Sequence, residues 1–128
     1  MLGVSLLGAE SCGDKKNMTE YNQNLELFLE EIHINENGKS KNKNILFMKI
    51  KAKNLTENKI NLGSNDFVLK NKNRTIKPYI GGANFDEEIK KDQIIEGTMT
   101  FEISKNLKKV TLIYRPHEKD LVTWNREI

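Results

Sequence analysis

The stretch Glu96-Gly97-Thr98-Met99-Thr100-Phe101-Glu102-Ile103 decides the fold class of this chain. From Gly97 onward, every second position holds glycine or a large apolar residue, and threonine or glutamate stands between them. Because successive side chains of a β-strand point to opposite faces, this alternation predicts a strand with one face in a core and the other in water. The segment therefore indicates a sheet that packs against a second layer on one side.

The same signal recurs along the chain between short polar turns. The clearest example is residues 45–54, where apolar side chains share one face, lysines share the other, and Asn54 ends the strand in a turn. Further strands are expected at residues 24–34, 60–62, 66–70, 74–80, 94–103, 110–115 and 121–125. Short strands separated by turns predict a single all-β domain, an immunoglobulin-like antiparallel β-sandwich of about seven strands.

Two segments allow more than one interpretation. In residues 24–34 the apolar parity changes near Glu30-Glu31, which predicts a β-bulge at that point. A helix is the alternative there because leucine and glutamate favour it, whereas the β-branched and aromatic residues favour a strand. Residues 85–92 are expected to lie in a loop that carries one helical turn.

Length and charge exclude some classes of protein. The 128 residues suit one domain rather than two. The 21 basic and 18 acidic residues leave a formal net charge of +3. A nucleic-acid-binding domain usually concentrates basic residues on one face with aromatic residues among them. Here the basic segment 39–53 is offset by acidic residues at 26–36 and 86–88, so nucleic acid is not expected as a partner.

The N-terminal segment resembles the end of a bacterial lipoprotein signal peptide. An apolar run rich in small residues precedes Cys12, Ser11 stands directly before it, and a polar tether follows. We therefore expect residues 1–22 to be a disordered leader and tether, with Cys12 as the lipid attachment site, and residues 23–128 to be the folded domain. The alternative is a leader, native or foreign, whose thiol is incidental. A membrane contact through the lipid anchor alone is expected, since no segment is long enough to span a bilayer as a helix.

A family resemblance supports this interpretation. Asn54 at the end of a long strand, Asp66-Phe67-Val68-Leu69 followed by the turn Asn71-Lys72-Asn73, and the strand from Gly97 to Ile103 are similar to a known pattern. It is that of the telokin-like, immunoglobulin-fold domains of bacterial extracellular lipoproteins, a family catalogued as a domain of unknown function. The resemblance covers about residues 25 to 115. It implies the sandwich fold and an extracellular, membrane-anchored location in the cell envelope, and it implies no catalytic residues.

The residues that could carry chemistry form no recognisable constellation. His33 and His117 are the two histidines, and neither belongs to a motif with metal-ligand spacing. The acidic residues at 86–96 lack the alternating ligands and central glycine of a calcium loop. We therefore expect no metal, no cofactor and no enzymatic activity.

Binding through loops is the remaining expectation. The candidate loops are residues 35–44, 81–92 and 116–120, and the candidate binding residues are Tyr79, Phe85, His117 and Trp124. Trp124 has an alternative role as a lid on the end of the core. The expected function is a non-catalytic cell-surface binding module whose partner is a protein or another cell-envelope ligand. The alternative functions are a proteinase inhibitor that acts through the 81–92 loop, and an enzyme with a concave pocket.

Overall fold

The computed structural model describes residues 20–21, 25–37 and 41–128. Within these residues the chain forms ten strands and one short 3-10 turn, η2 (Ser64–Asp66). The strands are β1 (Glu20–Tyr21), β2 (Leu25–Glu36), β3 (Lys43–Asn54), β4 (Ile60–Gly63), β5 (Phe67–Asn71), β6 (Arg74–Ile76), β7 (Asp86–Ile89), β8 (Ile94–Ser104), β9 (Lys109–Tyr114) and β10 (Val122–Glu127). Two of these strands, β1 and β7, were not expected from the sequence, so the described part holds more strands than the seven expected.

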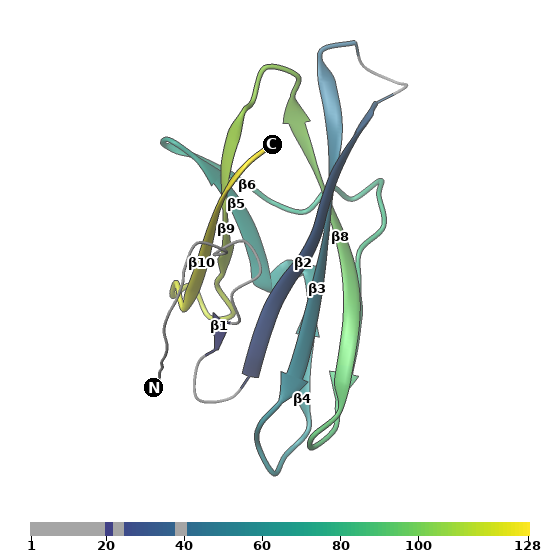
Figure 1. The fold of residues 1–128 in the computed structure, drawn as a ribbon, viewed down its shortest axis with the longest axis vertical. Coiled ribbons are helices and arrows are strands. Elements are labelled where there is room, and N and C mark those ends of the chain that lie inside the picture. Colours follow the sequence, from purple (N-terminus) through teal and green to yellow (C-terminus); the bar gives the residue numbers. More distant parts are fainter. Residues whose placement is uncertain (1–19, 22–24, 38–40) are drawn as a thin grey trace.

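The strands form two four-stranded antiparallel sheets and one small pair. The first sheet has the order β1-β2-β3-β8, and the second has the order β10-β9-β5-β6. A two-stranded sheet of β4 and β7 completes the domain. Figure 1 shows β2, β3 and β8 in one layer, with β5, β6, β9 and β10 in the other. The predicted all-β, antiparallel sandwich is confirmed.

The core lies between the inner faces of the two sheets. In β8, Met99, Phe101 and Ile103 are buried, as the alternation in the opening stretch predicts. In β3, the apolar positions are buried in strict alternation up to Asn54. The large core side chains are Leu25, Leu27, Leu29, Leu46, Met48, Ile50, Met99, Phe101 and Ile103 from the first sheet, and Phe67, Leu69, Val110, Leu112, Tyr114, Val122 and Trp124 from the second.

The predicted bulge in the first long strand is also confirmed. The register between β2 and β3 shifts between Leu29 and Glu31. Because one extra residue reverses which side chains face inward, Ile32 comes to lie opposite Met48 and packs against the core. The alternative of a helix in this segment is wrong.

Two expected boundaries differ from the structure. The helical turn expected in residues 85–92 is wrong, because residues 86–89 form β7 and pair with β4. This pairing buries Ile89 completely and leaves the three acidic residues before it in water, which an isolated helical turn would not achieve. At the N-terminus, Glu20–Tyr21 already pairs with β2, so the sheet begins ahead of the expected domain start at residue 23. The rest of the leader, including Cys12, lies outside the described residues.

Asn54 joins the end of β3 to the small sheet. Its Nδ2 donates to the carbonyl oxygens of Asn58, at 2.7 Å, and of Ile89, at 2.9 Å. Its Oδ1 accepts from the backbone N–H and the hydroxyl of Thr56, both at 2.8 Å. The side chain is fully buried, so each of these bonds replaces a bond to water that the folded chain cannot make. This asparagine therefore determines both the turn after β3 and the position of β7.

Gly97 lies where an aromatic ring covers the strand. A Cβ atom at this position would collide with the ring of Phe85, which comes from the loop before β7. The Phe85 ring in turn lies 6.3 Å, centroid to centroid, from the ring of Phe67 in β5. Glycine is therefore required at position 97 by close approach, because any side chain would displace a ring that packs against the core.

We predict that Gly97→Ala lowers the free energy of unfolding by about 2 kcal/mol, the usual cost of overpacking a core site. In a Phe85→Ala background, the same substitution should cost much less, because the ring that it would displace is gone. Chemical denaturation of the four proteins in this double-mutant cycle measures the coupling. An equal cost of Gly97→Ala in both backgrounds would contradict the proposed contact.

Candidate functional site

The four predicted binding residues do not form one site. Trp124 is only 2% exposed and its ring lies 6.5 Å from that of Phe67, so it belongs to the core and not to a recognition patch. Phe85 is half-buried against Gly97 and also serves packing. His117 is exposed in the loop after β9, whereas Tyr79 lies in the long connection between β6 and β7. Trp124 therefore takes the core position that was its alternative role, and a binding role for Tyr79, Phe85 and His117 stays a prediction.

A braced turn lies within the long connection from β6 to β7. The Gly82 N–H donates to the Tyr79 carbonyl at 3.1 Å, which closes a turn from Tyr79 to Gly82, named here the Ile80 turn. The Ile80 side chain at its tip is 97% exposed. The sequence pattern did not single out Ile80, although an isoleucine directly before Gly81-Gly82 is a signal for an apolar residue in a turn.

Strand β8 and Asn84 hold this turn in place. The Tyr79 N–H donates to the Thr100 carbonyl at 2.8 Å, and the Thr100 hydroxyl donates to the Ala83 carbonyl at 3.1 Å. Asn84 Nδ2 donates to the Tyr79 carbonyl at 2.8 Å, while its Oδ1 accepts from the Thr100 N–H at 3.4 Å. A Cβ atom at Gly82 would collide with Thr100, so the turn lies directly on the strand. The backbone of the Ile80 turn is thus preorganised by contacts to a rigid sheet.

A shallow hollow near His117 contains two groups whose pKa values are shifted. It has a volume of about 200 Å³, and Asp66, Tyr114 and His117 contribute to its lining. Burial raises the pKa of Asp66, although the Gly63 N–H, 3.0 Å from its Oδ2, acts in the opposite direction. Burial, together with the charge of Asp66, raises the pKa of Tyr114 to about 12. The Tyr114 phenol is therefore protonated at neutral pH, and the Asp66 carboxylate caps η2 by accepting the Gly63 N–H.

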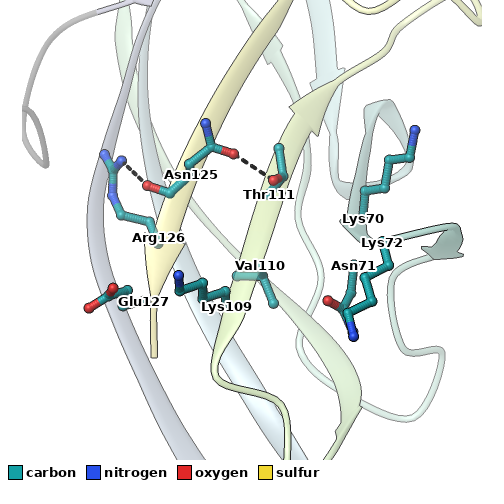
Figure 2. A pocket seen from close by; sticks show the side chains of 9 residues that line it. All are labelled: Lys70, Asn71, Lys72, Lys109, Val110, Thr111, Asn125, Arg126 and Glu127. Atoms are coloured by element: carbon teal, nitrogen blue, oxygen red, sulfur yellow. Dashed lines mark hydrogen bonds between the residues drawn. The ribbon is translucent and has the colours of Figure 1, made fainter.

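A larger hollow of about 400 Å³ lies over the second sheet, and we name it the basic hollow (Figure 2). Its lining residues are Lys70, Asn71, Lys72, Lys109, Val110, Thr111, Asn125, Arg126 and Glu127. Strand pairing brings them together, since Lys70 pairs with Thr111 and Arg126 pairs with Val110. The Thr111 hydroxyl donates to Asn125 Oδ1 at 2.6 Å. The sequence did not reveal this group, because its cations come from three separate segments.

The carboxyl group of Glu30, at the bulge in β2, is partly withdrawn from solvent. Its Oε1 is sealed from solvent and has no hydrogen-bond donor among the described residues. Burial raises the pKa of Glu30, and the neighbouring Glu96 raises it further, while Lys51 and Lys49 act in the opposite direction. Lys49 itself bonds to Glu31 at 3.2 Å.

The described residues form neither a metal-ligand cluster nor a membrane-spanning helix. Across residues 20–21, 25–37 and 41–128, no three histidine, cysteine, aspartate or glutamate side chains converge as metal ligands would. In the same residues, no helix is long and apolar enough to cross a bilayer. His33 instead makes an edge contact with Phe47, with ring centroids 5.4 Å apart.

The fold and its surfaces define a small antiparallel β-sandwich module. A family model described as a domain of unknown function, DUF4352, matches residues 13–120, and the chain belongs to this family. A search of curated protein sequences found no match. Of the resemblance noted from sequence, the membership of a family of unknown function is confirmed, and the telokin-like subclass stays a prediction.

Solved structures share the fold at low sequence identity. A provisionally assigned lipoprotein from Bacillus subtilis, ycdA, aligns with a TM-score of 0.70 and 18% identity over 87% of this chain and 38% of its own length. The yjhA protein of the same organism aligns with a TM-score of 0.62 and 16% identity, over 87% of this chain and 96% of its own length. An uncharacterised β-sandwich protein from Clostridium difficile aligns with a TM-score of 0.51 and 8% identity, over 88% of this chain and 90% of its own length. The chain thus spans well under half of ycdA.

We predict that Glu30→Gln stabilises the protein at neutral pH. A raised folded-state pKa means that the wild-type carboxyl favours the folded state while protonated, and this stability is lost as pH rises through the raised value. The variant should therefore unfold at a higher temperature than wild type near pH 7, by less than about 1 kcal/mol because the side chain is partly in water. The difference should vanish below the ordinary glutamate value of 4.5. Thermal unfolding across this pH range measures it, and a variant that is less stable at neutral pH would contradict the assignment.

Proposed function

We propose that this chain is a non-catalytic binding module of a bacterial cell-envelope lipoprotein, held outside the cell by lipid on Cys12. It recognises a protein partner through the Ile80 turn. The observation that carries the proposal is a large apolar side chain, 97% exposed, on a turn whose backbone is bonded to a rigid strand. Binding residues commonly stand on loops that a stable scaffold positions.

The Ile80 turn is ordered before any partner binds. An exposed apolar side chain by itself is ordinary on a protein surface. Here the turn that presents Ile80 is already ordered by Asn84 and Thr100, so a partner would not have to order it on binding. A central anchor side chain, aromatic or aliphatic, that becomes buried among energetically near-neutral contacts is the usual design of an interface centre. Tyr79, half-buried beside the turn, supplies such a neighbour.

The hollow near His117 favours binding over catalysis. A general acid or base works best with a pKa near the operating pH. The pKa of Tyr114 is raised away from neutrality, and the Asp66 carboxylate is occupied by the Gly63 N–H. At neutral pH the Tyr114 phenol therefore stays protonated, and the Asp66 carboxyl, although burial raises its pKa, accepts the Gly63 N–H.

A proteinase inhibitor is the second candidate, since the braced connection from β6 to β7 presents an exposed turn. Two features of this connection fit an inhibitor less well. The loop expected at 81–92 is shorter than the sequence suggested, because β7 takes up residues 86–89. The bond from Gly82 to Tyr79 also closes the turn, whereas a chain bound by strand addition is extended. An inhibitor would require the isolated chain to block a protease and Ile80→Asp to abolish the block.

The extracellular location is supported by two observations. The sequence around Cys12 has the small residue, thiol and polar tether that lipid attachment requires. One structure with the same fold, ycdA, is a provisionally assigned lipoprotein.

We predict a specific adduct from the Ile80 turn. A photo-crosslinking residue in place of the exposed Ala83 should link the chain to one partner on intact bacteria. Excess unlabelled wild-type chain should suppress the adduct, and Ile80→Asp should be at least about tenfold less effective as a competitor. The same residue at Asn106, in the turn between β8 and β9, is the control position. Equal competition by both chains, or the same adduct from Asn106, would remove the Ile80 turn as the site.

We also predict that Cys12 carries the lipid. Cells that express the chain with its full native leader should incorporate a labelled fatty acid into the wild type and none into Cys12→Ala. Gel fluorography of the immunoprecipitated chain measures the label. Absence of label from the wild type would end the lipoprotein proposal and leave the role of the Ile80 turn to be judged by crosslinking.

A further inference from the structure

The basic hollow carries a cluster of positive charge on the second sheet. Its lining holds four cationic side chains and one carboxylate, so the formal charge of the lining is +3. The formal net charge of the whole chain is also +3. The rest of the chain is therefore electrically balanced. Such concentration of charge creates a potential of one sign over the second sheet, which attracts anions from solution.

Two lysines of the hollow have no ion-pair partner among the described residues, as is also the case for several lysines elsewhere on the domain. Elsewhere Lys49, Lys59 and Lys91 each lie within ion-pair distance of a glutamate. Among the described residues, Lys72 and Lys109 have no carboxylate within that distance. Lys70 lies within electrostatic reach of Asp120, which is bonded at 2.6 Å to Arg115. Figure 2 shows that the four cationic side chains come from separate segments of the chain, with Arg126 bonded to the Asn125 carbonyl at 2.8 Å.

We propose that the basic hollow docks the domain on the anionic lipid surface of the membrane that anchors it. This inference rests on the proposed lipid at Cys12. Cys12 and Glu20, the first residue of β1, are eight positions apart, so an extended tether reaches about 28 Å at ~3.5 Å per residue. A domain of this size has a radius of gyration of about 13 Å, so the tether is no longer than the domain is wide. Some face of the domain is therefore always near the bilayer, and charge selects which one.

Docking through this face is compatible with binding at the Ile80 turn. The hollow lies over β5, β9 and β10 of the second sheet, whereas the turn is bonded to β8 of the first sheet. Figure 1 shows the connection from β6 crossing to the side of β8, away from β10. A domain that lies on lipid through the second sheet would leave the Ile80 turn uncovered for a partner.

Vesicle sedimentation tests the proposal with the full chain made without lipid on Cys12. The wild type should bind vesicles of equal parts phosphatidylglycerol and phosphatidylcholine and should not bind phosphatidylcholine alone. Each lysine near an anionic surface changes binding about fivefold, so Lys72→Gln with Lys109→Gln should weaken it by at least about tenfold. Raising the salt concentration should release the wild type, since the screening length is only about 8 Å at physiological ionic strength.

The matched control removes the same charge from the opposite face. Lys51→Gln with Lys53→Gln, on β3 of the first sheet, should change vesicle binding by less than about threefold. Thermal unfolding should show that both double variants are folded, because none of the four lysines is buried. Equal loss in the two variants, or no preference of the wild type for anionic vesicles, would overturn the proposal. Because the chain in this assay carries no lipid, a failure of fatty-acid labelling is a separate result.

Discussion

The core is organised around Phe67, whose ring gathers an aromatic cluster on the inner face of the second sheet and reaches the first sheet through Phe85. This ring is fully buried and lies 5.3 Å from Tyr114, 6.3 Å from Phe85 and 6.5 Å from Trp124, measured between ring centroids. Phe85 then covers Gly97 of the first sheet. A small sandwich has few large side chains with which to exclude water, so these rings supply much of the apolar area that holds the layers together.

Buried polar side chains complete what the apolar core begins. Asn54 and Thr100 are both fully buried, and each bonds to the backbone of a connection that lacks strand partners of its own, at Asn58 and at Ala83. Backbone groups in such connections would otherwise be withdrawn from water without compensation. The same bonds that satisfy them also fix the connections in space, and they hold the Ile80 turn against strand β8.

The chemistry of the domain is thereby divided between its surfaces. The first sheet carries paired charges, such as Lys49 with Glu31, and supports the Ile80 turn at its β8 edge. The second sheet carries the unbalanced positive charge of the basic hollow. The proposed lipid contact and the proposed partner contact therefore lie on different sheets. The charge balance of the whole chain conceals this division.

Local sequence patterns determined the class of fold, the long strands, the bulge at Glu30-Glu31 and the asparagine turn, because period-two burial and turn chemistry act over a few residues. Tertiary structure alone decided the rest. Strand β7 forms because β4 offers it a partner, Trp124 is buried because Phe67 faces it, and the basic hollow exists because pairing aligns three distant segments. Each of these depends on contacts between residues far apart in the chain, which no local pattern records.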